Sequence, residues 1–261
     1  MGDFDNKKYW AVILGGSSGL GLASAKKLAA HGMNICVIYR SPRSESQTVE
    51  SHFYEIRKTG VEFVEFNCDA MNTDKQIEVL SKLRSTIGNG KIRCLLHSIA
   101  KGNLKPMAEN ESLSNDDFRT TLDAMAVSLY DWTKLLFNTS LFADDARILA
   151  FTSEGSSKAW KNYAAVSAAK AALEAISRSI ALEFAPFGIR SNCIQAGVTD
   201  TAALRMIPKH EQLKDGSISR NPFRRLTTPE DVANVVYLLC KDEAAWINGA
   251  IIPVNGGEHL Q

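Results

Sequence analysis

The chain has 261 residues, of which 45% are hydrophobic and 23% charged, an ordinary composition for a globular protein. Its net charge of +1 argues against a general affinity for polyanions, so we expect no nucleic-acid partner. No apolar run is long enough to span a membrane, and residues 1–8 lack the apolar core of a signal peptide. We therefore expect a cytoplasmic protein. The five cysteines are scattered and form no Cys-x-x-C motif, which indicates neither a metal site nor disulfides.

Short apolar runs alternate with segments of helical period along the whole chain. Strands are predicted at 9–14, 34–39, 61–67, 92–97, 146–152, 190–195 and 250–254. Helices are predicted at 22–30, 45–58, 74–87, 115–137, 163–184 and 228–240. Such alternation is typical of parallel sheets. We predict an α/β fold of the Rossmann type, a doubly wound seven-stranded parallel sheet with helices on both faces, in a single domain over residues 1–261.

The first predicted strand ends in a glycine-rich turn. Gly15, Gly19 and Gly21 have the spacing G-x-x-x-G-x-G, between a strand and a helix. Glycines let the backbone approach a pyrophosphate closely, and the free N–H groups of a helix N-terminus attract its negative charge. We predict that Gly15, Ser18, Gly19 and Leu20 bind a dinucleotide. The alternative is a turn that is merely tight.

The end of the second strand distinguishes NAD from NADP. The sequence there is Tyr-Arg-Ser-Pro-Arg, and no acid precedes Glu45. An acid would bind the ribose diol of NAD, whereas a cation accommodates the 2′-phosphate of NADP. Arg40, with Ser41 or Arg43 assisting, therefore predicts NADPH as the cofactor. The alternative is an arginine in a solvated loop.

The ends of the third and fourth strands carry further polar side chains. Asp69, followed by Ala70, lies where an adenine amino group could donate a hydrogen bond to a carboxylate. His97 and Ser98 follow the fourth strand, beside the expected nicotinamide site. We assign Asp69, Ala70 and Ser98 to cofactor binding and interpret His97 as structural.

The helix that opens after Asn162 carries a phenol and an ammonium. Tyr163 and Lys170 are seven residues apart, two helical turns or about 10 Å, so both leave the same face. That face is otherwise apolar, with Val166, Leu173, Ile176, Ile180 and Phe184. Buried polar groups are costly unless paired, which favours a functional pair. The alternative is a core tyrosine with a lysine that reaches out to water.

With these motifs the chain resembles the short-chain dehydrogenases/reductases from end to end. The sequences at 248–249 (Asn-Gly) and 255–257 (Asn-Gly-Gly) are similar to that family's terminal motif. The resemblance implies that Lys170 also hydrogen-bonds the nicotinamide ribose. It further implies a homotetramer packed through the fourth and fifth helices.

Three features resemble one branch of that family, the enoyl-acyl-carrier-protein reductases. Most members carry Tyr-x3-Lys, but here Val166 stands four residues before Lys170 and the spacing is Tyr-x6-Lys. The turn after the fourth strand is His-Ser-Ile-Ala rather than Asn-Asn-Ala-Gly, and Met125 replaces an asparagine of the fourth helix. Residues 163–178 are most similar to the NADPH-preferring type III group.

The resemblance implies NADPH-dependent reduction of the 2,3 double bond of a 2-enoyl thioester in fatty-acid synthesis. In that reaction Tyr163 would stabilise the enolate oxygen, commonly by ~3–4 kcal/mol per donor, and Lys170 would lower the pKa of the phenol. Ser153, seventeen residues before Lys170, stands where several enoyl reductases have a second tyrosine. We count it as catalytic. Its presence leaves open a 3-oxoacyl reductase or another carbonyl or alcohol oxidoreductase, and an NADP-binding regulatory protein without turnover is a third reading.

The segment after the sixth strand is similar to the family's carboxamide-binding motif. This implies that the backbone of Thr199 and the hydroxyl of Thr201 bind the nicotinamide carboxamide, whereas the alternative for Thr201 is a helix cap. Residues 201–225 are poorly periodic, and we predict that they form a substrate lid. The lid has six cations and two acids, a balance that fits docking of an acidic acyl carrier protein and a merely solvated loop equally well.

Overall fold

A computed structural model describes residues 2–207 and 209–261. Seven parallel strands form one sheet in the order β3-β2-β1-β4-β5-β6-β7. The strands are β1 (Tyr9–Leu14), β2 (Asn34–Tyr39), β3 (Phe63–Asn67), β4 (Lys91–His97), β5 (Phe142–Thr152), β6 (Ile189–Ala196) and β7 (Ile251–Val254). The Rossmann-type prediction is confirmed. The order reverses between β1 and β4, and ligands of such sheets bind beyond the carboxyl ends of the strands at this point.

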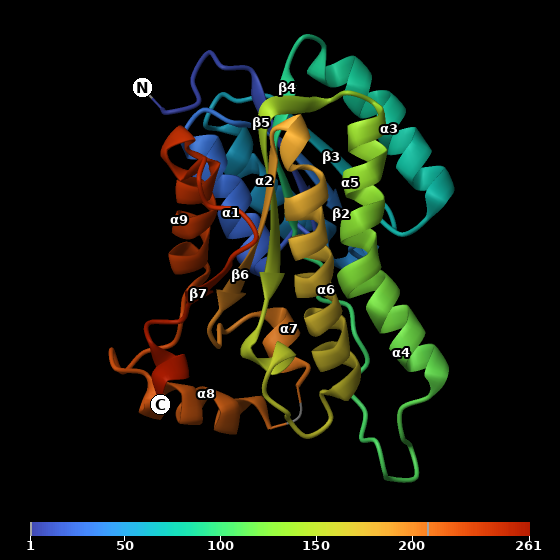
Figure 1. Ribbon diagram of the computed structural model, residues 1–261, viewed down its shortest axis with the longest axis vertical. Coiled ribbons are helices and arrows are strands. Elements are labelled where there is room, and N and C mark those ends of the chain that lie inside the picture. The colour runs from blue at the N-terminus through green and yellow to red at the C-terminus, as the bar shows by residue number, and fades with distance from the viewer. Residues whose placement is uncertain (1, 208) are drawn as a thin grey trace.

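Helices cover both faces of the sheet (Figure 1). One buried apolar cluster joins the sheet to α3, α5 and α6, and a second joins the other face to α1, α2 and α9. The helices are α1 (Gly19–Ala30), α2 (Ser46–Arg57), α3 (Thr73–Ile87), α4 (Asn115–Leu122), α5 (Ser128–Asn138), α6 (Ala164–Glu183), α7 (Ala202–Arg205), α8 (His210–Arg220) and α9 (Pro229–Cys240).

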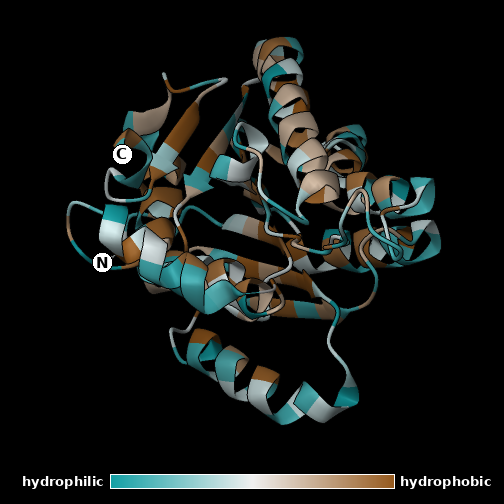
Figure 2. Ribbon diagram, turned by 90° about the horizontal axis from the view of Figure 1, so that it is seen from below, coloured by the Kyte–Doolittle hydropathy of each residue, from teal (hydrophilic) through white to brown (hydrophobic). Residues whose placement is uncertain are grey.

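The central strands are apolar along nearly their whole length because both of their faces are covered. The strand β1 is buried from Trp10 to Leu14, and β2 is buried from Ile35 to Ile38. Such continuous apolar runs are typical of parallel sheets, whereas strands with one wet face alternate. In the view from below, the sheet is mostly brown and the helices mix brown with teal (Figure 2).

The predicted helix over 115–137 is interrupted. A π-helical turn, Asp123–Val127, separates α4 from α5 and contains Met125. A π turn inserts extra backbone into the helix and is frequent at functional sites. The sequence pattern did not predict this π turn, because apolar residues recur with helical spacing both before and after it.

The predicted lid is more regular than its sequence pattern suggested. Within 201–225 the chain forms α7 and α8, and α8 lacks a clear apolar face, since Ser217 is its one buried residue. Pro208, which the lid prediction includes, lies outside the described residues. None of the helices in the described residues has the length and apolar character that crossing a membrane requires.

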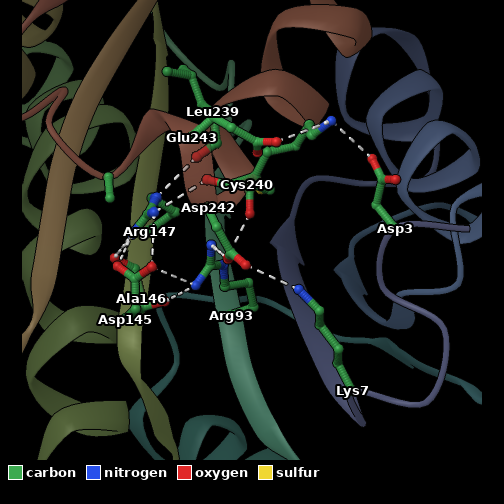
Figure 3. A network of polar contacts seen from close by, with 12 residues as sticks. Asp3, Lys7, Arg93, Asp145, Ala146, Arg147, Leu239, Cys240, Asp242 and Glu243 are labelled. Carbon is green, nitrogen blue, oxygen red and sulfur yellow. Dashed lines mark hydrogen bonds and ion pairs between the residues drawn. The ribbon is translucent and has the colours of Figure 1, made fainter.

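Two buried arginines hold α9 against the sheet, at the amino ends of the strands (Figure 3). The Nε atoms of Arg93 and Arg147 each donate a 2.9 Å hydrogen bond to a carbonyl at the end of α9, those of Cys240 and Leu239. Asp145 accepts from both guanidinium groups, at 2.7 and 3.0 Å. The arginines thus satisfy free carbonyls and the negative end of the helix dipole.

Candidate active site

Two adjoining cavities lie beyond the carboxyl ends of the strands. The larger, about 400 Å³, runs from the glycine turn across the ends of β1, β2 and β4. Ten of the residues predicted to hold a dinucleotide line it: Gly15, Ser18, Gly19, Leu20, Arg40, Asp69, Ala70, Ser98, Lys170 and Thr201. Ser41 and Thr199 lie outside this cavity.

The glycine turn is tight because no side chain fits into it. Gly15 has a φ of +84°, and a Cβ there would lie 2.5 Å from the carbonyl oxygen of Ser98. A Cβ on Gly21 would lie 2.3 Å from the carbonyl oxygen of Gly15. The side chain of Ser18, at the N-cap of α1, makes no capping hydrogen bond, so the first N–H groups of α1 are open to a ligand. This geometry fits the pyrophosphate of a dinucleotide.

At the predicted adenosine end, the polar side chains bind one another. Arg40 forms a 3.0 Å ion pair with Asp69, and Ser41 Oγ donates to Glu45 at 2.8 Å. The side chain of Asn67 holds the backbone of Ser41 through two hydrogen bonds of 3.1 Å. A 2′-phosphate would therefore compete with carboxylates for both predicted ligands. Preference for NADPH stays a prediction.

The smaller cavity, about 210 Å³, brings together the predicted catalytic residues. Ser153 follows β5, while Tyr163 and Lys170 come from the first two turns of α6 and its N-cap. Thr199 and Thr201, from the loop after β6, line the same cavity. Residues from three separate parts of the chain thus meet in one place, next to the dinucleotide cavity.

Lys170 is buried and bonded to the sheet. Its Nζ donates a 2.7 Å hydrogen bond to the carbonyl oxygen of Phe151, in β5. Burial lowers the pKa of Lys170 to about 8, although the neighbouring Cys193 and Glu174 oppose the shift. Near neutral pH most of the lysine is still the protonated donor.

The phenol of Tyr163 is largely buried as well. Its ring lies against Trp160, with the centroids 5.1 Å apart, and a Cβ on Gly155 would lie 2.7 Å from it. Burial raises the pKa of Tyr163, and the nearby Ser153 hydroxyl only partly opposes this rise. The expectation that Lys170 lowers the phenol pKa is therefore wrong for this structure, because burial raises that pKa and the opposing group is Ser153 rather than Lys170.

Ser153 presents an unused hydroxyl to the cavity. Its Oγ is buried and has no hydrogen-bond partner of normal geometry among the described residues. A buried hydroxyl without a partner is unusual and indicates a group that a ligand can satisfy.

Apolar side chains form the wall of the catalytic cavity beside Tyr163. Met125, in the π-helical turn, packs with Val166, Ala124 and Ala169 in a small buried cluster, against which Tyr163 also lies. Neither Met125 nor Val166 can donate or relay a proton. This part of the cavity wall is consequently apolar.

The two threonines after β6 make local hydrogen bonds. Thr201 Oγ1 accepts a 3.2 Å hydrogen bond from the N–H of Leu204 and so caps α7, as the alternative reading proposed. A hydroxyl that accepts can still donate, so this cap leaves a proton for a ligand. Thr199 Oγ1 donates to the carbonyl oxygen of Gly197 at 3.0 Å.

His97 lies beneath the site rather than in it. It is fully buried, its Nε2 lies 2.8 Å from Ser128 Oγ, and that hydroxyl donates to the carbonyl oxygen of Ala124 at 2.9 Å. Burial, followed by the charge of Lys170, lowers the pKa of His97 to about 3. The imidazole is therefore neutral and donates through Nε2, which agrees with a structural role.

Most cations of the lid are already paired with acids of the same chain. Arg205 and Lys214 both bind Asp200, at 2.9 and 3.2 Å. Arg220 binds the buried Glu258 at 2.7 Å. Arg225 is paired in the same way, with Asp231. The basic rim is thus weaker than the count of lid charges suggested.

Sequence reasoning missed several residues that line the catalytic cavity. Trp160 and Glu154 both do so, and so does Leu104, from the loop before α4. Trp160 could have been found as a large aromatic residue three positions before Tyr163, in an otherwise polar segment. Leu104 carries no local signal, since only the fold brings its loop to the site.

The fold and the site define a nicotinamide-dependent oxidoreductase: a doubly wound sheet, a glycine turn at its switch point and a Tyr/Lys pair at the same edge. A family model described as enoyl-(acyl carrier protein) reductase matches residues 15–259. The chain belongs to this family of short-chain dehydrogenases/reductases.

Individual relatives are more distant and differ in activity. A tropinone reductase homolog of Arabidopsis thaliana is 29% identical over 248 residues, which span 95% of this chain and 92% of the relative. A 7alpha-hydroxysteroid dehydrogenase of Escherichia coli K12 is 26% identical over the same shares. The crystal structure of an NADH enoyl-[acyl-carrier-protein] reductase from Aquifex aeolicus superposes with a TM-score of 0.85 at 26% identity, over 99% of this chain and 98% of that one.

Proposed function

We propose that this oxidoreductase uses NADPH to reduce the 2,3 double bond of a 2-enoyl thioester. The observation that carries the proposal is the apolar cluster of Met125 and Val166 beside Tyr163. Ketone reduction requires a proton delivered to the carbonyl oxygen and resupplied from solvent, which this wall does not support. Enoyl reduction also consumes a proton, but at the α-carbon, where water can supply it without a relay through the phenol. Tyr163 then needs only to donate a hydrogen bond to the enolate oxygen.

The bound cofactor would supply a hydride to the β-carbon of the substrate. The N-terminus of α1 would hold its pyrophosphate, Lys170 its nicotinamide ribose, and Thr199 and Thr201 its carboxamide. Tyr163 would donate a hydrogen bond to the thioester oxygen as negative charge develops there. Because burial raises the pKa of Tyr163, the phenol stays protonated, as a donor must.

Carbonyl reduction is the second candidate, and Ser153 favours it. Its buried, unpartnered hydroxyl lies in the same cavity as Tyr163, where it could polarise a ketone. Relatives named as tropinone reductase homologs and a hydroxysteroid dehydrogenase add weight to this candidate. A regulatory protein that binds NADP without turnover is the weakest, since the whole catalytic set is present.

Parallel assays of NADPH oxidation with crotonyl and acetoacetyl thioesters separate the three. Turnover of the enoyl compound alone supports the proposal, and turnover of the ketone alone overturns it in favour of carbonyl reduction. Tight binding of NADPH without turnover of either would identify a regulatory protein. Repeating each assay with NADH tests the cofactor preference.

We further propose that the substrate is carried by an acyl carrier protein in cytoplasmic fatty-acid synthesis and that the enzyme is a homotetramer. The predicted interface helices, residues 115–137 and 163–184, correspond to α4–α5 and α6 in the structure. Exposed apolar side chains on these helices support the assembly. Val127 and Tyr130 are exposed at the start of α5, and Leu182 is 78% exposed on α6. Light scattering tests the assembly, and a monomer at micromolar concentration would contradict it.

A further inference from the structure

A buried glutamate, Glu174, forms a hydrogen bond close to the catalytic residues of α6 and β5. Glu174 is one turn after Lys170 on α6 and, although charged, is only 9% exposed. Its Oε1 accepts a 2.6 Å hydrogen bond from Thr152 Oγ1, the last residue of β5. Glu174 does not line the dinucleotide cavity or the catalytic cavity. Neither the cofactor scheme nor the substrate scheme uses it.

The bond to Glu174 is one of two that join the end of β5 to successive turns of α6. Lys170 binds the carbonyl oxygen of Phe151, and Glu174 binds the hydroxyl of Thr152. The next residue is Ser153, which lines the catalytic cavity. The position of Ser153 relative to Lys170 thus depends on this pair of bonds.

The sheet holds this end of β5 on one side only. The ladder with β4 ends at Ala150, while the ladder with β6 continues to Thr152. On the β4 side, Phe151 and Thr152 lack a strand partner. The two bonds to α6 supply the restraint that the ladder no longer gives.

Glu174 also follows the buried Lys170 by one helical turn and, without forming a direct ion pair, its charge acts to raise the pKa of that lysine. The other titratable groups that face this ammonium are His97 of β4, which is neutral, and Cys193 of β6, a thiol whose pKa burial raises to about 11. Tyr163, in the same cavity, is a neutral phenol. Glu174 is therefore the anion that can balance the lysine in this interior.

We propose that Glu174 is a positioning residue that fixes Ser153 through Thr152 and keeps Lys170 protonated. This rests on the site assigned in the proposed function but not on whether the substrate is an enoyl thioester or a ketone. The two actions are separable, because the hydrogen bond and the charge can be removed one at a time.

Two nearly isosteric substitutions make the separation. Glu174→Gln removes the charge but keeps an oxygen that accepts from Thr152, so the apparent pKa of Lys170 should fall. We expect the loss of NADPH affinity at alkaline pH, followed by nucleotide fluorescence, to move down by about one pH unit, together with the alkaline limb of kcat/KM. Thr152→Val keeps the charge and removes the bond. It should lower kcat about tenfold at every pH without moving either limb, and Thr152→Ser should restore kcat.

Glu183→Gln, an exposed change near the end of α6, is the matched control and should leave both readouts unchanged. Folded variants of Glu174 and Thr152 with wild-type pH profiles and kcat would overturn the proposal. So would an equal, pH-independent loss in both variants, since that indicates a purely structural contact. Because NADPH binding is measured without substrate, an inactive wild-type enzyme would defeat the proposed function and still leave the action of Glu174 on Lys170 tested, through the pH dependence of that binding.

Discussion

Individual residues of the site are governed by burial. Burial raises the pKa of Tyr163, lowers that of Lys170 to about 8 and lowers that of His97 to about 3, and each shift favours the neutral form. In such a water-poor setting a hydrogen bond to a developing negative charge is worth more than in water. Desolvation disfavours the ionised form of Tyr163 and therefore keeps the phenol protonated, so that it can donate a hydrogen bond.

Tyr163→Phe should lower kcat/KM at least tenfold and leave NADPH affinity little changed, because the lost donor acts on the substrate oxygen. Steady-state kinetics and fluorescence titration measure the two effects. Tyr54→Phe, which alters an exposed phenol of α2, is the control and should have no effect. A Tyr163→Phe enzyme as active as the wild type would show that this phenol is not the donor.

His97 should make the fold sensitive to acid. Its pKa is about 3 in the folded state and ~6.5 when unfolded, so the unfolded chain binds the extra proton between these values. This contribution to stability is complete above pH 6.5 and is lost as the pH falls. Between pH 7 and pH 5 the loss should be about 2 kcal/mol. Urea unfolding of wild type and His97→Gln at both pH values checks this. Equal pH dependence in the two proteins would contradict the assignment.

At the scale of elements, α6 carries the chemistry because its period brings distant positions to one face. Tyr163 precedes its first turn, Lys170 follows two turns later and Glu174 one turn after that. The helix α9, by contrast, has a structural role. It contributes no residue to the catalytic cavity, and Arg93 and Arg147 bind its last carbonyls to the sheet.

Asp145→Asn should therefore destabilise the fold by about 2–4 kcal/mol, since it removes the anion of the buried Arg147 and one of the two anions of the buried Arg93; the partial exposure of Asp145 limits the loss. Arg93 keeps its ion pair with Asp242, and the partly exposed Arg190 also loses its contact with Asp145. Asp144→Asn, an adjacent exposed change, should cost less than about 0.5 kcal/mol. Urea denaturation compares the two. Equal midpoints would show that the network adds nothing to stability.

At the scale of the whole molecule, stability and catalysis occupy opposite ends of the sheet. The arginine network lies at the amino ends of the strands, and the two cavities lie at the carboxyl ends, where residues of α7 line both of them. The predicted lid is tied to the loop after β6, because Asp200 lies between Thr199 and Thr201 and forms ion pairs with both Arg205 and Lys214. Charge reversal at Arg205 would break its ion pair with Asp200, so a change in KM at this position would not report on acyl-carrier-protein docking alone.

Lys209 is a cleaner probe of a carrier-protein surface. It is exposed at the start of α8, and Lys209→Glu should raise KM about three- to fivefold for carrier-bound substrate at low salt, but not for a small thioester. The difference should shrink at high ionic strength. Lys82→Glu on α3, at the far end of the molecule from α8 in Figure 1, is the control. Equal effects on both substrates would exclude the docking surface.

Local patterns were enough to predict the parallel sheet, the glycine turn and the shared face of Tyr163 and Lys170. Each of these depends on periodicity or on backbone freedom within one short segment, and such information is written along the chain. The approximate bounds of most strands and helices followed for the same reason.

Only the tertiary structure decided the electrostatics. Arg40 binds Asp69 across two strands, the cations of the lid find acids from other segments, and Tyr163 is more strongly affected by burial than by Lys170. Burial and ion pairing depend on which distant segments meet, because the cost of a charge is set by everything that surrounds it in space. The local sequence pattern does not specify these surroundings, so it could not predict the pKa shifts or the ion pairs.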